Sequence, residues 1–251
     1  RKIISTARDR VPGMRVGVLA SGSGTILGAL LGRQLPIVAV IADRPCDSGC
    51  ASCQAVCPTR AIELDPVRID LGRCVLCGDC EPACPTNKLS FDNDFKTATT
   101  DREALVVTAA RPAIDPVKVS AALRQRFGRS LKLRSVSAGG GNACELEVNA
   151  LTNVNFDIGR YGIDIVASPR HADGLVLTGP ISRNMAQALQ LCWDGMPDPK
   201  LVIAVGACAI SGSPFEAGGA LDRSFLERFK PTLYVPGCPA HPLTFISVIL
   251  D

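Results

Sequence analysis

The chain has few aromatic residues, little net charge and no long apolar run. Phe, Trp and Tyr make up 4% of its 251 residues, and 27 Lys and Arg against 24 Asp and Glu leave a formal net charge of +3. So small an excess of positive charge does not argue for binding to nucleic acid or to a membrane surface. Because no run approaches about 18 apolar residues, the sequence contains no candidate membrane-spanning helix. The first residues also lack the apolar core of a secretion signal.

The chain is rich in apolar residues and in cysteine. Hydrophobic residues make up 47% of the sequence, and 251 residues suffice for one large domain or two modest ones. Its twelve cysteines, if reduced, imply a reducing compartment. We therefore expect a soluble cytoplasmic protein. Peripheral attachment to the cytoplasmic face of a membrane through partner subunits would leave no mark on this chain.

Eight of the cysteines lie within 39 residues, in two runs that each end in Cys-Pro. The first, Cys46 to Pro58, has the spacing C-x3-C-x2-C-x3-C-P, and the second, Cys74 to Pro85, has C-x2-C-x2-C-x3-C-P. A disulfide framework is the alternative, but disulfide-dense chains are small, secreted and poor in core. Zinc sites draw four ligands from two pairs, which is a different pattern. The doubled run therefore predicts iron–sulfur clusters.

The second run has the spacing of bacterial ferredoxins, and residues from about 44 to 95 resemble the two-cluster ferredoxin family. In that family three close thiolates hold one [4Fe–4S] cluster, and the fourth cysteine of each run binds the other cluster. The resemblance implies that one cluster takes Cys46, Cys50, Cys53 and Cys84. It implies that the other takes Cys74, Cys77, Cys80 and Cys57.

Four segments are expected along the chain: a βαβ-like segment at 1–45, the ferredoxin domain at 46–95, a linker with one strand at 96–116, and an α/β domain at 117–251. In the last segment, short apolar runs alternate with helical patterns, and the runs are Leu131–Val136, Ile163–Ala167, Gly174–Thr178, Lys200–Val205 and Thr232–Val235. Alternation of this kind favours a doubly wound parallel sheet. The expected fold class is thus α/β, with a flavodoxin-like sheet and an N-terminal α+β two-cluster ferredoxin domain.

Residues 14–31 and 35–45 resemble the opening βαβ of glycinamide-ribonucleotide formyltransferases. The resemblance implies a phosphate at the helix N-terminus that follows the loop 21–25. The catalytic Asn, His and Asp of that family have no counterpart, because the first cysteine run begins at once. We therefore interpret this segment as a relic of gene fusion, or as a nucleotide-like βαβ unit without its substrate domain.

Three further cysteines follow predicted strands, each in a loop that contains glycine: Cys144, Cys208 and Cys238. Loops at the carboxyl ends of parallel strands converge on one site. Glycine lets the backbone approach a cluster closely and point N–H groups at sulfur. The alternative interpretation is three buried structural cysteines, which are common in cores. The pattern predicts a third cluster at this edge of the sheet.

Five stretches of this region carry a second resemblance: G-N-A-C-E-L-E-V at 141–148, S-P-R-H-A-D at 168–173, T-G-P-I-S-R-N-M at 178–185, P-D-P-K-L-V-I-A-V-G-A-C-A-I-S-G-S-P-F at 197–215 and V-P-G-C-P-A-H-P at 235–242. Together they look like the small subunit of membrane-bound [NiFe] hydrogenases, nearest to the formate-hydrogenlyase type. That family is homologous to the cluster-bearing B subunit of respiratory complex I. The complex I form has adjacent cysteines where Cys144 stands alone, which favours the hydrogenase-like branch.

This resemblance implies an electron-transfer subunit without catalysis of its own. A proximal [4Fe–4S] cluster would exchange electrons with a catalytic large subunit that holds a [NiFe] centre, or with a partner like the D subunit of complex I that serves a quinone. Membrane subunits of the same complex are compatible partners, and nucleic acid is not. The alternatives are the B subunit of a complex I-like NADH–quinone oxidoreductase and a free-standing ferredoxin-like carrier.

One position departs from the hydrogenase pattern, which reads C-N-x-C-E and supplies two ligands. Here the first place is Gly141, so only Cys144, Cys208 and Cys238 match. The spare thiol is Cys192, on a predicted helix, where a buried structural cysteine is the alternative to ligation. The third cluster is accordingly expected as a three-cysteine [4Fe–4S] cluster with a labile or externally ligated iron, as a [3Fe–4S] cluster, or not at all. By the same resemblance, the stretch 168–173 is expected near the cluster.

Overall fold

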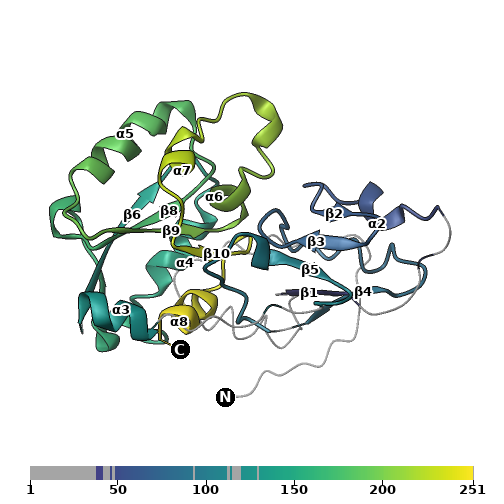
Figure 1. Ribbon diagram of the computed structural model, residues 1–251, viewed down its shortest axis with the longest axis horizontal. Coiled ribbons are helices and arrows are strands. Elements are labelled where there is room, and N and C mark those ends of the chain that lie inside the picture. Colours follow the sequence, from purple (N-terminus) through teal and green to yellow (C-terminus); the bar gives the residue numbers. More distant parts are fainter. Residues whose placement is uncertain are drawn as a thin grey trace, which may run out of the picture.

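The computed structural model describes residues 38–41, 46, 49–92, 94–111, 114, 120–128 and 130–250. The interpretation of residues 14–37 as a strand, turn and helix therefore lies outside the described residues. Figure 1 shows two parts, an α/β domain built on one sheet and a smaller region of antiparallel strands beside it. No helix within the described ranges is long and apolar enough to cross a bilayer.

The α/β domain is built on a five-stranded parallel sheet. Its strands are β6 (Leu131–Ser137), β7 (Ile163–Ile165), β8 (Gly174–Thr178), β9 (Leu201–Val205) and β10 (Leu233–Val235), in the spatial order β10-β9-β8-β6-β7. All four pairings are parallel. Taken from the other edge, this is the 2-1-3-4-5 order of flavodoxin-like folds. The predicted fold class is confirmed.

Helices cover both faces of this sheet (Figure 1). The described helices of the domain are α3 (Ser120–Phe127), α4 (Ala143–Ala150), α5 (Arg183–Asp194), α6 (Ala207–Ser211), α7 (Ser224–Arg228) and α8 (Pro242–Leu250), with 3-10 turns η2 (Ile158–Tyr161), η3 (Pro169–His171) and η4 (Glu216–Gly218). Alternate residues of β8 enter two cores. Leu175 and Leu177 pack with α5 and α7, whereas Val176 packs with α4 and α8. Because both faces are buried, β8 and β9 are apolar along almost their whole length.

The smaller region contains two antiparallel sheets. β1 (Val38–Ile41) pairs with β4 (Leu89–Asp92), and β2 (Ile62–Glu63), β3 (Arg68–Asp70) and β5 (Val106–Thr108) form a second sheet. Helix α2 (Ser52–Ala55) and the 3-10 turn η1 (Glu103–Leu105) complete it. The strand expected near 36–42 thus pairs with the segment after the second cysteine run. We therefore propose that the ferredoxin domain begins with β1.

The segment between the two parts adds to the edge of the parallel sheet. The Thr99 N–H donates to the Tyr234 carbonyl at 3.0 Å, and the Tyr234 N–H donates to the Thr99 carbonyl at 2.8 Å. Thr99 is fully buried. Nearby, Arg102 binds both carboxylate oxygens of Asp70, at 2.8 and 2.5 Å. The antiparallel region is thereby fixed against β10.

An aromatic cluster joins α5 to α7. The rings of Trp193 and Phe225 meet edge to face with centroids 5.7 Å apart, and Phe229 lies within 5.1 Å of both. Phe225 is only 2% exposed. This aromatic cluster covers part of one face of the parallel sheet.

We predict that Phe225→Ala lowers the free energy of unfolding by about 3–5 kcal/mol, because it leaves a cavity in this closed cluster. Urea denaturation followed by Trp193 fluorescence measures the change. Leu191→Ala, on the same helix α5 and 64% exposed, is the matched control and should shift stability by about 0.5 kcal/mol or less. Equal effects of the two substitutions would contradict the packing assignment.

Candidate iron–sulfur sites

The second cysteine run lines a small apolar pocket. Apolar side chains of β2, β3 and β4 close it, among them Ile62, Ile69 and Phe91. Its cysteines are Cys57, Cys74, Cys77 and Cys80. These are the four named from the sequence for one cluster, including the one that comes from the first run. An apolar cradle rimmed by four thiols fits a [4Fe–4S] cluster, which needs four thiolates and little water.

Two thiols of this pocket, Cys74 and Cys80, resist ionisation without a cation. Burial first, against the Leu76 N–H that lowers it, and then the charges of nearby cysteines raise the pKa of Cys74 to about 12, those of Cys80, Cys57 and Cys77. The pKa of Cys80 is likewise raised to about 12, by burial first and then by Cys77 and Cys57. Coordinating metal deprotonates a thiol outright. Cluster assembly here must therefore release protons and replace them with iron charge.

The last cysteine of the second run lies close enough to the first run for their charges to interact. Burial raises the pKa of Cys53, and the charges of Cys84 and Cys46 raise it further. Cys84 therefore lies beside the first run, as the crossed arrangement requires. The set named from the sequence is completed by Cys50, which is half-buried. Helix α2, which carries Cys53, lies on the side of the antiparallel region away from the parallel sheet (Figure 1).

The fourth cysteine of each run begins a turn, and the two turns have the same geometry. The Ala61 N–H donates to Cys57 Sγ at 3.3 Å, and the Lys88 N–H donates to Cys84 Sγ at 3.2 Å. In both turns the residue three after the cysteine has a positive φ, 53° at Arg60 and 50° at Asn87. Although burial raises it, the pKa of Cys84 is held below its usual value by the Thr86 hydroxyl first, and then by the N–H groups of Leu89 and Lys88. N–H groups aimed at sulfur stabilise the thiolate that a cluster needs.

The three remaining predicted ligands meet at the carboxyl ends of the parallel strands. Cys144 begins α4, Cys208 lies in α6, and Cys238 follows β10. Burial first, against the Ala240 N–H that lowers it, and then the charges of Cys238 and Cys208 raise the pKa of Cys144 to about 12. Burial and Cys238 raise the pKa of Cys208 to about 11. The structure therefore brings these three thiols into one group.

Gly206 makes room for this group. Its φ is +89°, and a Cβ built on it would lie 2.5 Å from Cys144 Sγ. A backbone in this left-handed region already favours glycine, and the sulfur excludes any side chain on steric grounds. Gly206 is therefore required where α4 packs its cysteine against the end of β9.

A buried arginine holds the Cys208 loop, and the sequence did not single it out. The guanidinium of Arg223 donates to four backbone carbonyls at 2.8 to 3.2 Å, those of Pro180, Cys208, Ala209 and Ile210. The carbonyls of Cys208, Ala209 and Ile210 belong to the short helix α6, where the last carbonyls lack helical partners. Burial lowers the pKa of Arg223, but guanidinium remains charged in proteins. Its neighbours, Asp222 and Ser224, carry no local pattern that reveals this role.

Glu145 fixes the start of α4 to the sheet. Its Oε1 accepts hydrogen bonds from Ser137 Oγ at 2.5 Å and from Thr178 Oγ1 at 2.8 Å. Ser137 and Thr178 are the last residues of β6 and β8. The carboxylate therefore ties together three elements at the edge where the thiols gather, and its charge contributes to the raised pKa of Cys144.

The sequence analysis named Cys192 as a spare thiol and placed the stretch 168–173 near the third site, and the structure shows where both lie. Cys192 lies beside Arg134, whose charge opposes the burial that raises the pKa of this thiol. Pro169, in η3, packs at 3.4 Å from a Cβ built on Gly195, where α5 ends. Because α5 runs back from the carboxyl end of β8, η3 lies at the opposite end of the sheet. The expectation that the stretch 168–173 lies near the third site is wrong, because the chain crosses back to begin β8.

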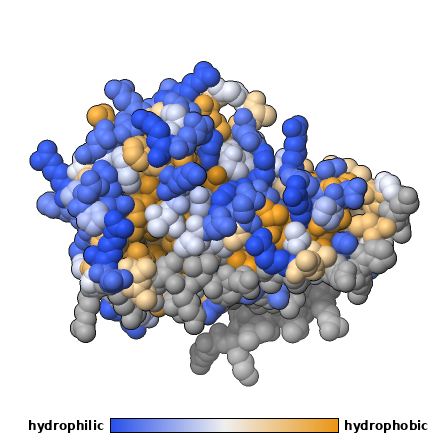
Figure 2. All heavy atoms as spheres, in the orientation of Figure 1, coloured by the Kyte–Doolittle hydropathy of each residue, from blue (hydrophilic) through white to orange (hydrophobic). Residues whose placement is uncertain are grey.

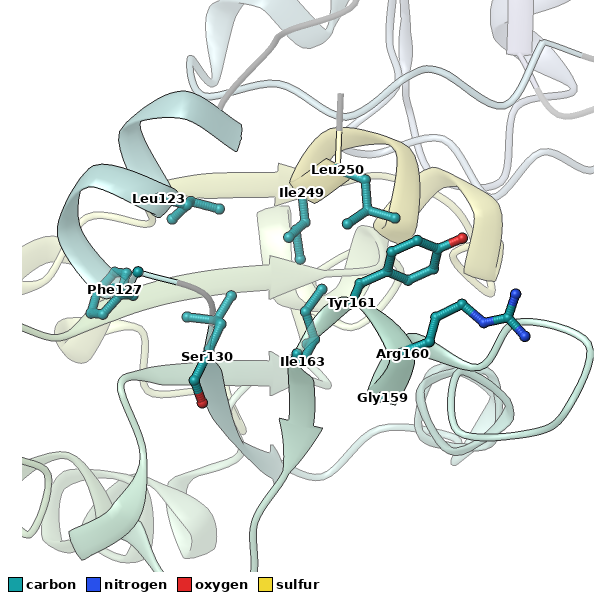
Figure 3. A pocket seen from close by; sticks show the side chains of 12 residues that line it. Leu123, Phe127, Ser130, Gly159, Arg160, Tyr161, Ile163, Ile249 and Leu250 are labelled. Atoms are coloured by element: carbon teal, nitrogen blue, oxygen red, sulfur yellow. The ribbon is translucent and has the colours of Figure 1, made fainter.

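A groove at that opposite end contains no cysteine. Figure 3 shows it between α3, η2 and the end of α8. Its wall is mostly apolar, with Phe127, Tyr161, Ile249 and Leu250 among the lining residues. It lies at the amino ends of β6 and β7, whereas the thiols lie at the carboxyl ends. The groove therefore has no direct part in the cysteine sites.

Within the described ranges, no three or more His, Cys, Asp or Glu side chains are arranged around a single metal ion. A single zinc ion needs all its thiolates about 2.3 Å from one point. A cubane cluster spreads its irons, so its cysteines stand farther apart.

Comparison with known proteins agrees with both parts of the chain. Residues 142–251 match the family described as NADH ubiquinone oxidoreductase, 20 Kd subunit, and residues 45–88 match the 4Fe-4S dicluster domain. These matches define an iron–sulfur protein of the oxidoreductase class that includes complex I and related hydrogenases. The chain belongs to the family of the 20 Kd subunit of NADH ubiquinone oxidoreductase and carries a 4Fe-4S dicluster domain ahead of it.

Several relatives support this membership. The probable membrane-bound hydrogenase subunit mbhJ of Pyrococcus furiosus is 39% identical, over 46% of this chain and 70% of that protein. The B subunit of the NADH-quinone oxidoreductase of Aquifex aeolicus is 39% identical, over 50% of this chain and 69% of that protein. Formate hydrogenlyase subunit 7 of Escherichia coli is 38% identical, and the match spans about half of each chain. Hydrogenase and quinone-reductase relatives are thus equally similar in identity.

We predict that Cys57→Ser damages the cluster built on the second run, Cys74 to Cys80, because its side chain lines that cavity. EPR of the reduced protein, compared with Cys50→Ser, distinguishes the two ferredoxin-type signals. Loss confined to the cluster built on Cys46 to Cys53 would disprove the crossed arrangement.

We predict that Gly206→Ala removes or strongly depletes the third cluster, because the new Cβ overlaps Cys144 Sγ. The matched control is Gly218→Ala, where a Cβ meets no atom within 4 Å. Iron analysis and EPR should show the ferredoxin-type clusters retained in both variants. A third cluster of unchanged occupancy in Gly206→Ala would contradict the assignment of this site.

Proposed function

We propose that this chain is the iron–sulfur electron-transfer subunit of a [NiFe]-hydrogenase-like complex, of the energy-converting or formate-hydrogenlyase type. It would relay electrons between its ferredoxin-type clusters and a catalytic large subunit. A bound [4Fe–4S] cluster supplies one-electron transfer, and the protein sets its potential through ligation, burial and hydrogen bonds. The observation that carries the proposal is the presence of three cysteine sites in one chain, two of them in contact through their loops.

The loop before the second run touches the loop that carries Cys208. A Cβ on Gly72 would lie 2.8 Å from Ile210 Cγ2, and Ser213 Oγ donates to the Arg73 carbonyl at 3.2 Å. Arg73 also forms an ion pair with Glu216. These contacts join the residues next to Cys74 to those after Cys208. These contacts support a path for electrons from the first-run site to the second-run site and then to the third site.

The exposed thiol edge supports a partner subunit. Cys238 is exposed and Cys144 and Cys208 are half-buried, so the third site opens to the surface. In Figure 2 the visible face of the α/β domain is largely hydrophilic, with scattered apolar patches. A protein that passes electrons onward needs its last site close to the acceptor. We propose that a large subunit covers the edge formed by Cys144, Glu145 and Cys238, and that membrane subunits are reached through it.

A complex I-like NADH–quinone oxidoreductase is the second candidate, favoured by relatives of that name at similar identity. The lone Cys144, in place of adjacent cysteines, favours the hydrogenase branch. Co-purification of the native complex decides between them. Hydrogen evolution or uptake by the complex supports the proposal, whereas quinone reduction without hydrogen turnover supports the second candidate.

We predict that the chain elutes in a complex with a large subunit in native size-exclusion chromatography, because the third site needs an acceptor. Glu145→Lys should weaken this association, since it reverses a charge on the proposed contact edge and breaks two hydrogen bonds. Glu227→Lys, on α7, is the charge-matched control and should leave the complex intact. A stable monomer with full hydrogen-oxidising activity would refute the proposed function.

A further inference from the structure

We propose that the third site holds its cluster through three thiolates and leaves the fourth coordination position open to a small thiolate from solution. The site would then be a ligand-binding centre as well as a relay. This inference rests on the proposed function, because it assumes a cluster at Cys144, Cys208 and Cys238. It is carried by the space at Gly141 and by the engagement of Cys192, His241 and Glu145 elsewhere.

Gly141 leaves an open place three residues before Cys144. A Cβ built on it meets no atom within 4 Å, and both Gly141 and Asn142 are exposed. The neighbouring Gly140 is different, because a Cβ there would lie 2.9 Å from Gly179 Cα. The fold therefore has room for a side chain at 141 and has none there. The resulting gap faces solvent.

Cys192 cannot fill this gap. It lies nine residues beyond Arg183, the first residue of α5, which begins at the carboxyl end of the sheet. Nine residues of helix span about 14 Å, so Cys192 is well down the sheet from the thiols. Its charged neighbour is Arg134, in the middle of β6, and not a cysteine of the third site.

His241 cannot fill it either. The Leu243 N–H donates to His241 Nδ1 at 3.1 Å, where His241 begins α8. A neutral imidazole that accepts at Nδ1 carries its hydrogen on Nε2. Nε2 is buried and has no partner among the described residues. It is therefore oriented as a hydrogen-bond donor, and a ring nitrogen that carries hydrogen is not a metal ligand.

Glu145 is an oxygen donor at this edge, and it is already held. Its Oε1 receives hydroxyl hydrogens from two different strands, at 2.5 and 2.8 Å. Turning the carboxylate onto iron would break both bonds and release α4 from the sheet. With Cys192, His241 and Glu145 each engaged elsewhere, the proposal takes the fourth donor from solution.

A small thiolate suits this place by size and chemistry. Iron in a sulfur environment favours a soft sulfur donor. Binding is a ligand substitution: the thiol binds iron through sulfur and gives its proton to solvent, a solvent molecule leaves, and no electron is transferred. The opening beside Gly141 admits a ligand of a few atoms without movement of the described backbone.

The test uses the full chain, isolated without oxygen in thiol-free buffer, supplied with ferrous iron and sulfide, and reduced with dithionite. It is titrated separately with 2-mercaptoethanol and with 13C-labelled cyanide. We expect the EPR signal of the third cluster to shift with either probe and ENDOR to detect coupling to the carbon. Gly141→Cys should abolish both responses, because a fourth thiolate takes the position. Cys192→Ser should respond as the unmodified chain does.

A three-iron signal that converts on adding ferrous iron would also support the proposal, since it shows that no residue retains the fourth iron. A third cluster that ignores both probes in the unmodified chain would overturn it. If Glu145→Gln then restores the response, the carboxylate is the fourth ligand. No third cluster in the unmodified chain or in Gly141→Cys would instead overturn the proposed function.

Discussion

The parallel register of β9 and β10 is the constraint on which the third cysteine site depends. The Gly206 N–H donates to the Val235 carbonyl at 2.8 Å, and the Ala207 N–H donates to the Gly237 carbonyl at 2.9 Å. The ladder thus continues past both strands and into their loops. Cys208 and Cys238 follow these loops directly, so a pairing made by backbone groups brings two thiols together. Cys144 joins them only because Gly206 has no side chain.

The spacing of residues along the chain predicts part of the fold and of the cysteine sites. Two cysteine runs and five apolar runs identify the ferredoxin-like region and the parallel sheet, because ligation and strand burial both act over a few residues. The pairing of β1 with β4 joins residues far apart in sequence, so no local pattern reveals it. Arg223 binds four carbonyls through tertiary packing alone. Placing the stretch 168–173 required knowing that the chain crosses back before β8.

Two glycines near Cys144 show why a residue type alone does not reveal its role. At Gly206 a side chain would strike sulfur, so glycine is imposed by packing. At Gly141 a side chain would meet nothing, so packing gives no reason for glycine. The first is a structural requirement of the site. In the proposed site the second is a feature of chemistry, because a glycine there supplies no ligand.

The pairing of Thr99 with Tyr234 has a consequence for the rate of electron movement. Tunnelling between redox centres falls steeply with their separation, so two separate proteins must dock again for every transfer. Here the buried Thr99, paired with Tyr234 as an isolated bridge, holds the antiparallel region against the edge of the parallel sheet. In the proposed relay, the gap between donor and acceptor is therefore set once, when the chain folds. Transfer across it would be a first-order event that does not depend on protein concentration.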